Sequence, residues 1–254
     1  MIICKSHEEI ARMARAGAVV ADVLALIGER AQPGVTTAEL DALADEFIRS
    51  QGGQPTFKGY RGYPASICAS ANDLVVHGIP GPYALVDGDV LSVDVGVTLE
   101  GFVADSACTF PIGEIPPEAE RLLEACRAAL AGGIAQCRAG NRLSDISHAI
   151  QTVTEEHGFS VVRSLVGHGV GRSMHEEPQI PNYGEPGRGP RLSPGMTFAI
   201  EPMITAGSPE VVLHEDEWSI STADGSLAAH FEHTVAITEA EPRILTAARA
   251  PVHT

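Results

Sequence analysis

Apolar side chains in the first fifty residues recur at helical spacing and divide into two helices. Residues 6–31 carry one apolar stripe, with Ser6 placed as the helix cap. Thr36-x-x-Glu39 is a capping box, in which each side chain bonds the backbone N–H of the other residue, and it opens a second helix. That helix ends at Gly52-Gly53, because glycine readily adopts the left-handed conformation that closes a helix.

The period then changes to that of β-strands, in which successive side chains alternate between two faces. An aromatic loop rich in Gly and Pro covers residues 54–64. The pattern predicts short strands near 65–70 and 73–77, followed by a hairpin from 90–98 to 102–110.

The second half of the chain repeats this order of elements. Pro116 opens a predicted helix through about residue 138, and a second helix runs from Leu143 to Glu156. The glycines that close the helices match in pairs, and Gly34 lies as far before Gly140 as Gly52 lies before Gly158. We therefore expect an α/β (α+β) chain with one domain, 1–254, made of related halves at about 1–112 and 113–254.

The polar residues that match between the halves are all histidines or carboxylates. They form three pairs, namely His77 with His168, Asp94 with Glu201, and Asp105 with Glu232. A duplicated fold would preserve core and glycine positions for packing alone, but it would not select ligand types at every matching polar position. The pairs therefore indicate a shared site between the halves.

Two of these acids, Asp94 and Asp105, interrupt apolar strands of the predicted hairpin. If the hairpin turns at Leu99-Glu100, they face each other directly, with Cβ atoms about 5 Å apart. Like charges at that distance are destabilising without a cation or a shared proton between them. Carboxylates combined with imidazole suit manganese, iron(II), cobalt or zinc, and four carboxylates suit a two-metal hydrolase.

The segment Leu165–Pro178, LVGHGVGRSMHEEP, holds His168 and His175 among glycines. We expect Gly167, Gly169 and Gly171 to permit positive φ and a close approach to a ligand. The spacing matches neither a phosphate loop nor the H-E-x-x-H zinc motif. Neutral imidazoles serve as metal ligands or proton carriers, and the alternative is a loop with two ordinary surface histidines.

Composition narrows the class of protein further. Hydrophobic residues make up 44% and charged residues 20%, as in soluble globular enzymes. A net charge of −16 argues against a DNA-binding surface. The five cysteines are odd in number and form no C-x-x-C pair, which is typical of reduced thiols. We find no leader sequence or membrane-length apolar run and expect a cytoplasmic protein with no membrane contact.

Motifs distributed along nearly the whole chain resemble one enzyme family. They are HGIP (77–80), VDVG and ADSA (93–96, 104–107), GHGVGRSMHEEP (167–178), PGMTFAIEPM (194–203) and FEHT (231–234). Together they resemble the type I methionine aminopeptidases, which have the pita-bread fold of two pseudo-symmetric helix-plus-antiparallel-sheet halves around a dimetal site. The resemblance implies removal of the initiator methionine from nascent polypeptides whose second residue is small.

Site residues follow from the same resemblance. It implies two divalent ions (cobalt, manganese, iron(II) or zinc) held by Asp94, Asp105, His168, Glu201 and Glu232. It also implies that His77 and His175 bind substrate, and that Glu201 acts as general base on a water bridging the ions. The implied methionine pocket comprises Tyr60, Tyr63, Cys68, Met174, Met203 and Trp218. Trp218 is equally compatible with an ordinary core position.

Two positions depart from the family pattern. Arg61 stands where the family often has histidine, and Met174 stands where it often has an aromatic residue. Arg61 adds a cation near the mouth of the site, and Met174 adds a flexible, polarisable side chain. Both departures bear on substrate preference and rate, and neither falls on a metal ligand.

Two alternatives remain open at this stage. Xaa-Pro aminopeptidases and prolidases share the fold and a similar metal set, but they usually carry an additional N-terminal domain, whereas this chain begins at the first catalytic helix. A non-catalytic binding relative is the other alternative, although it should have lost ligands that are all present here. The short interval between His168 and Glu201 argues against the type II enzymes. We expect a monomer, with ribosome association as a candidate partnership.

Overall fold

The computed structural model describes residues 1–248, so the last six residues of the predicted domain, 249–254, lie outside the described residues. Two pairs of helices follow the predicted ranges: α1 (His7–Arg30), α2 (Thr37–Ser50), α3 (Pro117–Ala135) and α4 (Leu143–Glu156). The capping boxes at Ser6 and Thr36 are both present, with each hydroxyl accepting from the backbone N–H three residues on. The predicted third helix is three residues too long, because it ends at Ala135.

Within the described residues the strands form four antiparallel sheets, and two of these build the centre of the molecule. One pairs β1 (Gln54–Pro55), β4 (Val90–Leu99) and β2 (Cys68–Ala71), with β5 (Phe102–Pro111) on β4. The other has the order β15-β14-β9-β7-β8. Its strands are β7 (Val166–Gly169), β8 (Glu176–Pro181), β9 (Thr197–Ile200), β14 (His233–Ala236) and β15 (Arg243–Ile244).

Two small sheets flank this centre. The first has the order β13-β10-β6, from β6 (Ser160–Val161), β10 (Met203–Thr205) and β13 (Ala228–His230). The second has the order β11-β12-β3, from β3 (Leu74–Val76), β11 (Val211–Leu213) and β12 (Ile220–Thr222). A short 3₁₀ turn, Tyr60–Gly62, lies in the predicted aromatic loop.

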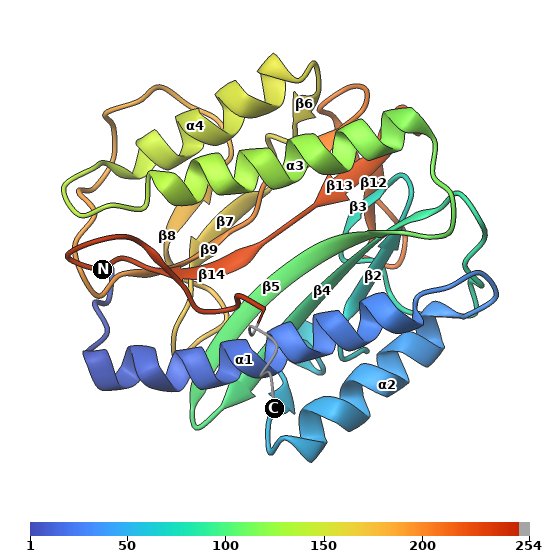
Figure 1. The fold of residues 1–254 in the computed structure, drawn as a ribbon, viewed down its shortest axis with the longest axis horizontal. Coiled ribbons are helices and arrows are strands. Elements are labelled where there is room, and N and C mark those ends of the chain that lie inside the picture. The colour runs from blue at the N-terminus through green and yellow to red at the C-terminus, as the bar shows by residue number, and fades with distance from the viewer. Residues whose placement is uncertain (249–254) are drawn as a thin grey trace, which may run out of the picture.

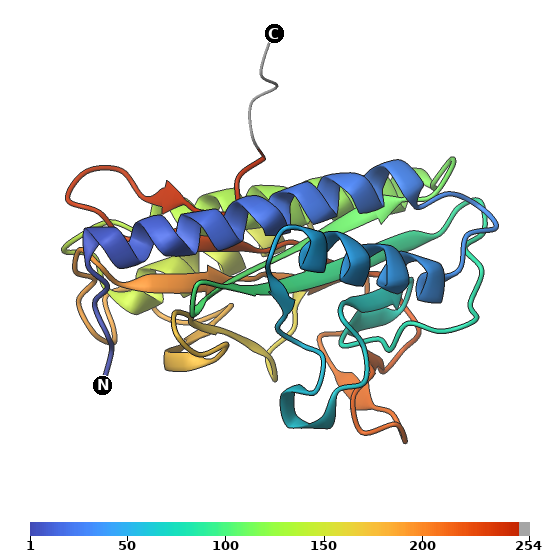
Figure 2. The same cartoon turned by 90° about the horizontal axis from the view of Figure 1, so that it is seen from below.

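The long helices α1 and α3 cover one face of the strands. Helix α1 packs on β4 and β5, and α3 packs on β9, β10 and β13 (Figure 1). Figure 2 shows the loops around the 3₁₀ turn and β11–β12 projecting from the opposite face. Each half buries its own apolar cluster, centred on Leu40 and Leu91 in the first and on Leu122 and Phe198 in the second. The helix-free face is therefore left for the functional site.

The hairpin β4–β5 differs in register from the prediction. Leu99 pairs with Phe102, so the turn is Glu100-Gly101 and not Leu99-Glu100. Glu100 has φ 51° and Gly101 has φ 77°, which is the pair of positive values that a two-residue type I′ turn needs. Asp94 consequently faces Ala107 instead of Asp105, so the prediction of directly opposed acids is wrong. The two acids are diagonal neighbours on one face of the sheet.

The glycines of the GHGVG segment have a different use from the predicted one. Gly167, Gly169 and Gly171 all have negative φ, so the positive φ that glycine permits is not used here. A Cβ on Gly167 would lie 2.6 Å from the carbonyl oxygen of Ala199, and one on Gly169 would lie 2.3 Å from that of Glu177. Glycine therefore lets β8 and β9 close on both sides of β7, which carries His168.

Strand pairing also changes the predicted match between His77 in the first half and His168 in the second. Strand β2 is antiparallel to β4, which carries Asp94, and β7 is antiparallel to β9, which leads into Glu201. By this pattern β7 corresponds to β2, whereas His77 follows β3, a strand of another sheet. The predicted equivalence of His77 and His168 is therefore wrong, because their similar sequences occupy different sheets.

Candidate active site

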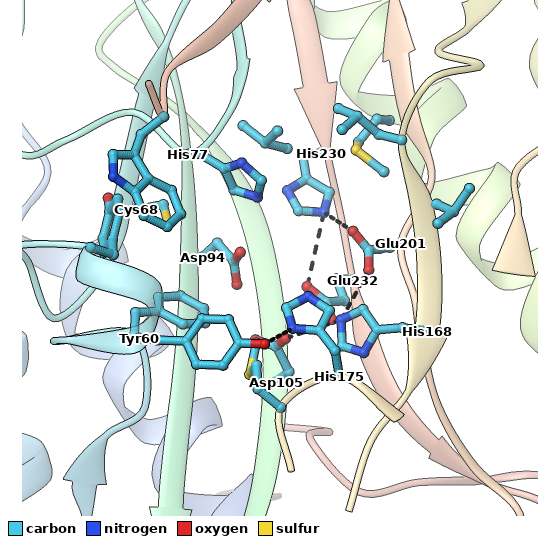
Figure 3. Close-up of a pocket in the computed structure, with 18 of the residues that line it drawn as sticks. Tyr60, Cys68, His77, Asp94, Asp105, His168, His175, Glu201, His230 and Glu232 are labelled. Carbon is cyan, nitrogen blue, oxygen red and sulfur yellow. Dashed lines mark hydrogen bonds and ion pairs between the residues drawn. The ribbon is translucent and has the colours of Figure 1, made fainter. Parts of the chain in front are cut away.

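One cavity, of about 280 Å³, brings together every site residue predicted from the sequence. It lies at the junction of the two halves, on the face without α1 and α3 (Figure 3). The predicted residues among its lining are Tyr60, Tyr63, Cys68, His77, Asp94, Asp105, His168, Met174, His175, Glu201, Met203, Trp218 and Glu232. The cavity therefore joins an acid and imidazole cluster to an apolar pocket.

The carboxylates come from strands that are anchored to each other across the junction. Asp94 lies within β4 and Asp105 within β5, while Glu232 immediately precedes β14. The hydroxyl of Thr234 accepts from the backbone N–H of Asp105 at 2.9 Å, and the N–H of Glu232 donates to the carbonyl of Ala107 at 2.9 Å. These bonds hold the acids from the two halves side by side.

His168 is oriented by its own backbone. Its Nδ1 lies 2.9 Å from the carbonyl oxygen of Gly169, which only accepts, so Nδ1 carries the proton. The Nε2 lone pair therefore points into the cluster, 3.4 Å from Glu201 Oε1 and 3.8 Å from Asp105 Oδ2. A backbone partner on the other ring nitrogen is typical of metal-bound histidine.

Several buried atoms of the cluster have no hydrogen-bond partner among residues 1–248. They include Asp94 Oδ1, Asp105 Oδ1 and Glu232 Oε1. Buried polar groups are nearly always satisfied, and unpaired carboxylate oxygens are especially costly. The ligand atoms of Asp105, His168 and Glu232 also lie within 4.8 Å of one another. This donor set fits divalent cations that prefer oxygen and imidazole ligands.

The pKa values of the cluster without bound metal agree with a site for divalent cations. Burial raises the pKa of Asp94, and burial followed by neighbouring carboxylates raises the pKa of Asp105, Glu201 and Glu232 well above its usual range. Burial lowers the pKa of His168 to about 4, which leaves a neutral ligand. Cations between the carboxylates would offset both their burial and their mutual repulsion.

The predicted substrate residues surround the cluster on the open side. Tyr60 Oη lies 2.8 Å from His175 Nδ1, and the ring of His175 lies close to that of His168, tilted by 43° with centroids 4.2 Å apart. His77 lies across the cavity with its ring centroid 6.4 Å from that of Trp218. Burial lowers the pKa of His77 to about 4, and burial together with the Arg61 cation lowers the pKa of His175. Both imidazoles are therefore set to act as neutral hydrogen-bonding groups.

The apolar pocket is built from aromatic and sulfur-containing side chains. Tyr63 is buried, donates to the carbonyl of Gly78 at 3.0 Å and meets Trp218 edge-on at 5.1 Å between centroids. Cys68, Met174 and Met203 are also buried around it. Trp218 is only partly buried and lines the cavity, so it does more than fill the core. An unbranched apolar side chain would find adaptable contacts here.

The two departures from the family pattern both lie at this cavity. Arg61 is exposed at its rim, with Cζ 5.4 Å from the centroid of the Tyr60 ring. Met174 is buried in the pocket wall. Neither side chain contacts a predicted metal ligand through a hydrogen bond or ion pair found in the described residues.

One residue of the acid and imidazole cluster, His230 at the end of β13, was not predicted from the sequence. Its side chain is 2% exposed, and Nε2 lies 3.8 Å from Glu201 Oε2 and 3.9 Å from Glu232 Oε2 (Figure 3). The signal was its position two residues before Glu232, which places both on one face of an extended segment. The apolar lining residues Phe57, Val76, Leu165 and Val166 were also missed.

Comparison with known proteins agrees with this geometry. Residues 11–239 match metallopeptidase family M24. The methionine aminopeptidase of Clostridium perfringens is 51% identical over 97% of this chain and 99% of its own length. The crystal structure of the methionine aminopeptidase from Rickettsia prowazekii is 40% identical, covers 97% of this chain and 100% of its own, and has a TM-score of 0.96.

The prolidase of Pyrococcus furiosus, at 20% identity and a TM-score of 0.79, shares the fold alone, and this chain covers 66% of it. The chain belongs to metallopeptidase family M24, with the methionine aminopeptidases as its similar relatives. It is therefore a hydrolase of the pita-bread fold that uses divalent metal ions. No helix within residues 1–248 is long and apolar enough to cross a membrane.

Proposed function

We propose that this enzyme is a methionyl aminopeptidase that removes the initiator methionine from nascent polypeptides when the second residue is small. The observation that carries the proposal is the shared cavity, where the acid and imidazole cluster adjoins a pocket of Tyr63, Cys68, Met174, Met203 and Trp218. A methionine side chain in that pocket would place its own carbonyl next to the cluster. The similar relatives are named methionine aminopeptidases, which supports the same activity.

The proposed metal ligands are Asp94, Asp105, His168, Glu201 and Glu232, which would hold two divalent ions. Cobalt, manganese, iron(II) and zinc all suit this mixture of carboxylate and imidazole. Such ions, when bound, generate a nucleophile from water at neutral pH and stabilise the charge that develops on the carbonyl oxygen.

The remaining chemistry belongs to side chains of this chain. Glu201, with oxygens facing the cavity, would take the proton from the attacking water and pass it to the leaving amine as general base and acid. His77 and His175, on opposite sides of the cavity, would donate hydrogen bonds to the substrate and to the oxyanion. The hydrogen bond from Tyr60 fixes the ring of His175 for this task.

We also propose the organisation and cellular setting of the enzyme. Residues 1–254 would form one catalytic domain with repeated halves, about 1–112 and 113–254. The order helix, helix and three paired strands, β2-β4-β5 and β7-β9-β14, supports this repeat. We further propose a cytoplasmic monomer that meets its substrates as they leave the ribosome.

A panel of peptides tests the substrate proposal. The metal-loaded enzyme should release methionine from Met-Ala-Ser, release far less from Met-Leu-Ser, and leave Leu-Ala-Ser intact. Cleavage of Xaa-Pro peptides in preference to Met-Ala-Ser would replace the proposal with a prolidase-type activity. Failure to cleave any peptide while metal is bound would favour a binding relative.

A further inference from the structure

His230 occupies a fixed position at the edge of the charged cluster. Its backbone pairs with Met203 of β10 in the small sheet. On its other side, its N–H donates to Thr109 Oγ1 at 2.9 Å, and the same hydroxyl donates back to its carbonyl at 2.9 Å. Because the backbone is anchored on both sides and the side chain is buried, the imidazole has little room to turn away from the carboxylates.

The ring nitrogen of His230 that points into the cluster lacks a hydrogen-bond partner in the described part of the chain. This atom, Nε2, is buried. Its nearest charged neighbours are Glu201 Oε2 at 3.8 Å and Glu232 Oε2 at 3.9 Å, too far for hydrogen bonds. Two atoms bound to one ion lie no more than about 4.4 Å apart, because each metal–ligand bond is about 2.0–2.2 Å long. The distances therefore suit an ion between these atoms.

The potential ligands form two groups that share one residue. Asp105, His168 and Glu232 make one group, and Glu201, His230 and Glu232 make the other, each with its ligand atoms within 4.8 Å. Each group contains one imidazole, and Glu201 lies between the two rings, with Oε1 near His168 and Oε2 near His230. In Figure 3 the rings of His168 and His230 lie on different sides of this carboxylate.

We propose that His230 is a sixth protein ligand of the metal centre and gives the ion held by Glu201 and Glu232 a nitrogen ligand. This inference rests on the metal centre of the proposed function but not on its substrate. A nitrogen ligand on this side favours borderline ions such as cobalt, iron(II) and zinc over magnesium. Zinc should compete with magnesium more strongly at this centre than at one built on a single imidazole.

Cobalt-loaded protein provides a direct test that does not depend on peptidase activity. In proton NMR, each cobalt-bound histidine with a protonated second nitrogen gives its own strongly shifted, exchangeable imidazole N–H signal. We expect His230→Gln to lose one such signal and to weaken one of the two calorimetric cobalt-binding events at least tenfold. His230→Asn provides a second, shorter amide variant if the first folds poorly.

His233→Gln is the matched control. His233 is also partly buried and lies next to Glu232, but its Nδ1 bonds Thr246 Oγ1 at 2.9 Å, and it does not line the cavity. This variant should retain every shifted signal and both cobalt affinities. If the His230 variants retain all signals and affinities, the ligand assignment is overturned, even where the Michaelis constant for Met-Ala-Ser rises. Loss of methionine release in the wild type with the signals intact would count only against the proposed substrate.

Discussion

Asp105 and Glu232 lie side by side at the junction of the two halves, although one belongs to the first hairpin and the other to the last strands. Thr234 Oγ1 donates to the carbonyl of Asp105 at 2.8 Å, and the N–H of Glu232 donates to Ala107. Backbone bonds therefore hold the two carboxylates together despite their mutual repulsion. Cations bound between the two carboxylates would offset this repulsion.

Asp105→Asn should abolish peptidase activity while leaving the fold intact. The substitution removes one carboxylate of the proposed ligand set, so we expect metal affinity and kcat/KM to fall by more than about 100-fold. The metal-free variant should be at least as stable as the wild type, because a buried like charge is gone. Methionine release and thermal denaturation measure these effects, with exposed Glu46→Gln as the control. Turnover at the wild-type rate in Asp105→Asn would exclude Asp105 as a ligand.

The stability of the metal-free protein should fall as the pH rises above about 7.5. Above that pH nearly all histidines are neutral in both the folded and the unfolded chain, because the pKa of an unfolded histidine is about 6.5. Burial raises the pKa of Asp105, Glu201 and Glu232, so the folded state keeps protons that the unfolded chain has already released. A state that binds more protons loses relative stability as they are removed.

Thermal denaturation of chelated protein between about pH 7.5 and 9 measures this trend. The melting temperature should decrease with pH in the wild type, and the decrease should be smaller in Asp105→Asn. Adding cobalt should reverse the slope, because metal ligands must be deprotonated to bind. A metal-free melting temperature that stays level or rises with pH would contradict the buried-acid account.

The loop before His175 depends on a buried ion pair. Lys5 Nζ lies 2.6 Å from Glu176 Oε2, with side chains only 4% and 9% exposed. Glu176 Oε1 also accepts from the N–H groups of Arg172 and Ser173. Lys5→Met should cost about 3–5 kcal/mol of unfolding free energy, because it leaves a buried carboxylate unpaired. Looser placement of His175 should also raise the Michaelis constant for peptides.

Denaturant unfolding and peptide kinetics check both effects. The double variant with Lys5→Met and Glu176→Met should recover much of the lost stability, since no charge then remains buried. Arg12→Ala, which breaks the exposed pair with Glu8, should cost less than about 1 kcal/mol. Equal costs for Lys5→Met and Arg12→Ala would show that burial of the pair is unimportant.

Arg61 should bias the enzyme toward peptides with an acidic residue beyond the second position. Its exposed guanidinium lies at the cavity rim over Tyr60. An exposed ion pair contributes about 0.2–1 kcal/mol, so the preference for Met-Ala-Glu over Met-Ala-Lys should be roughly 1.5- to 5-fold at low salt. Arg61→Gln should remove the preference. If the preference is unchanged in Arg61→Gln, or does not depend on salt, then Arg61 is not its cause.

Local signals in the sequence were sufficient to predict the helices. The capping boxes at Ser6 and Thr36 act within one helical turn, so the starts of these helices can be predicted from the local sequence alone. The register of the β4–β5 hairpin was misplaced because the turn is chosen by the backbone conformation of Glu100 and Gly101. A shift of one residue in the turn converted a facing pair of acids into a diagonal one.

Non-local pairing explains what the sequence did not reveal. His230 enters the cluster because β13 pairs with β10 and bonds Thr109 of β5. Gly167 and Gly169 of the GHGVG segment are required by the carbonyls of Ala199 and Glu177, which approach from the neighbouring strands β9 and β8. His77 and His168 share a sequence pattern but lie in different sheets. The spacing of residues along the chain does not predict any of these contacts.

Metal titration of chelated protein, followed by methionine release from Met-Ala-Ser, tests the central claim most directly. The metal-free protein should be inactive, and cobalt, manganese or iron(II) should restore release with no more than two ions bound per chain. Asp105→Asn should not recover under the same titration. Full release of methionine from protein shown to be free of metal would contradict the account.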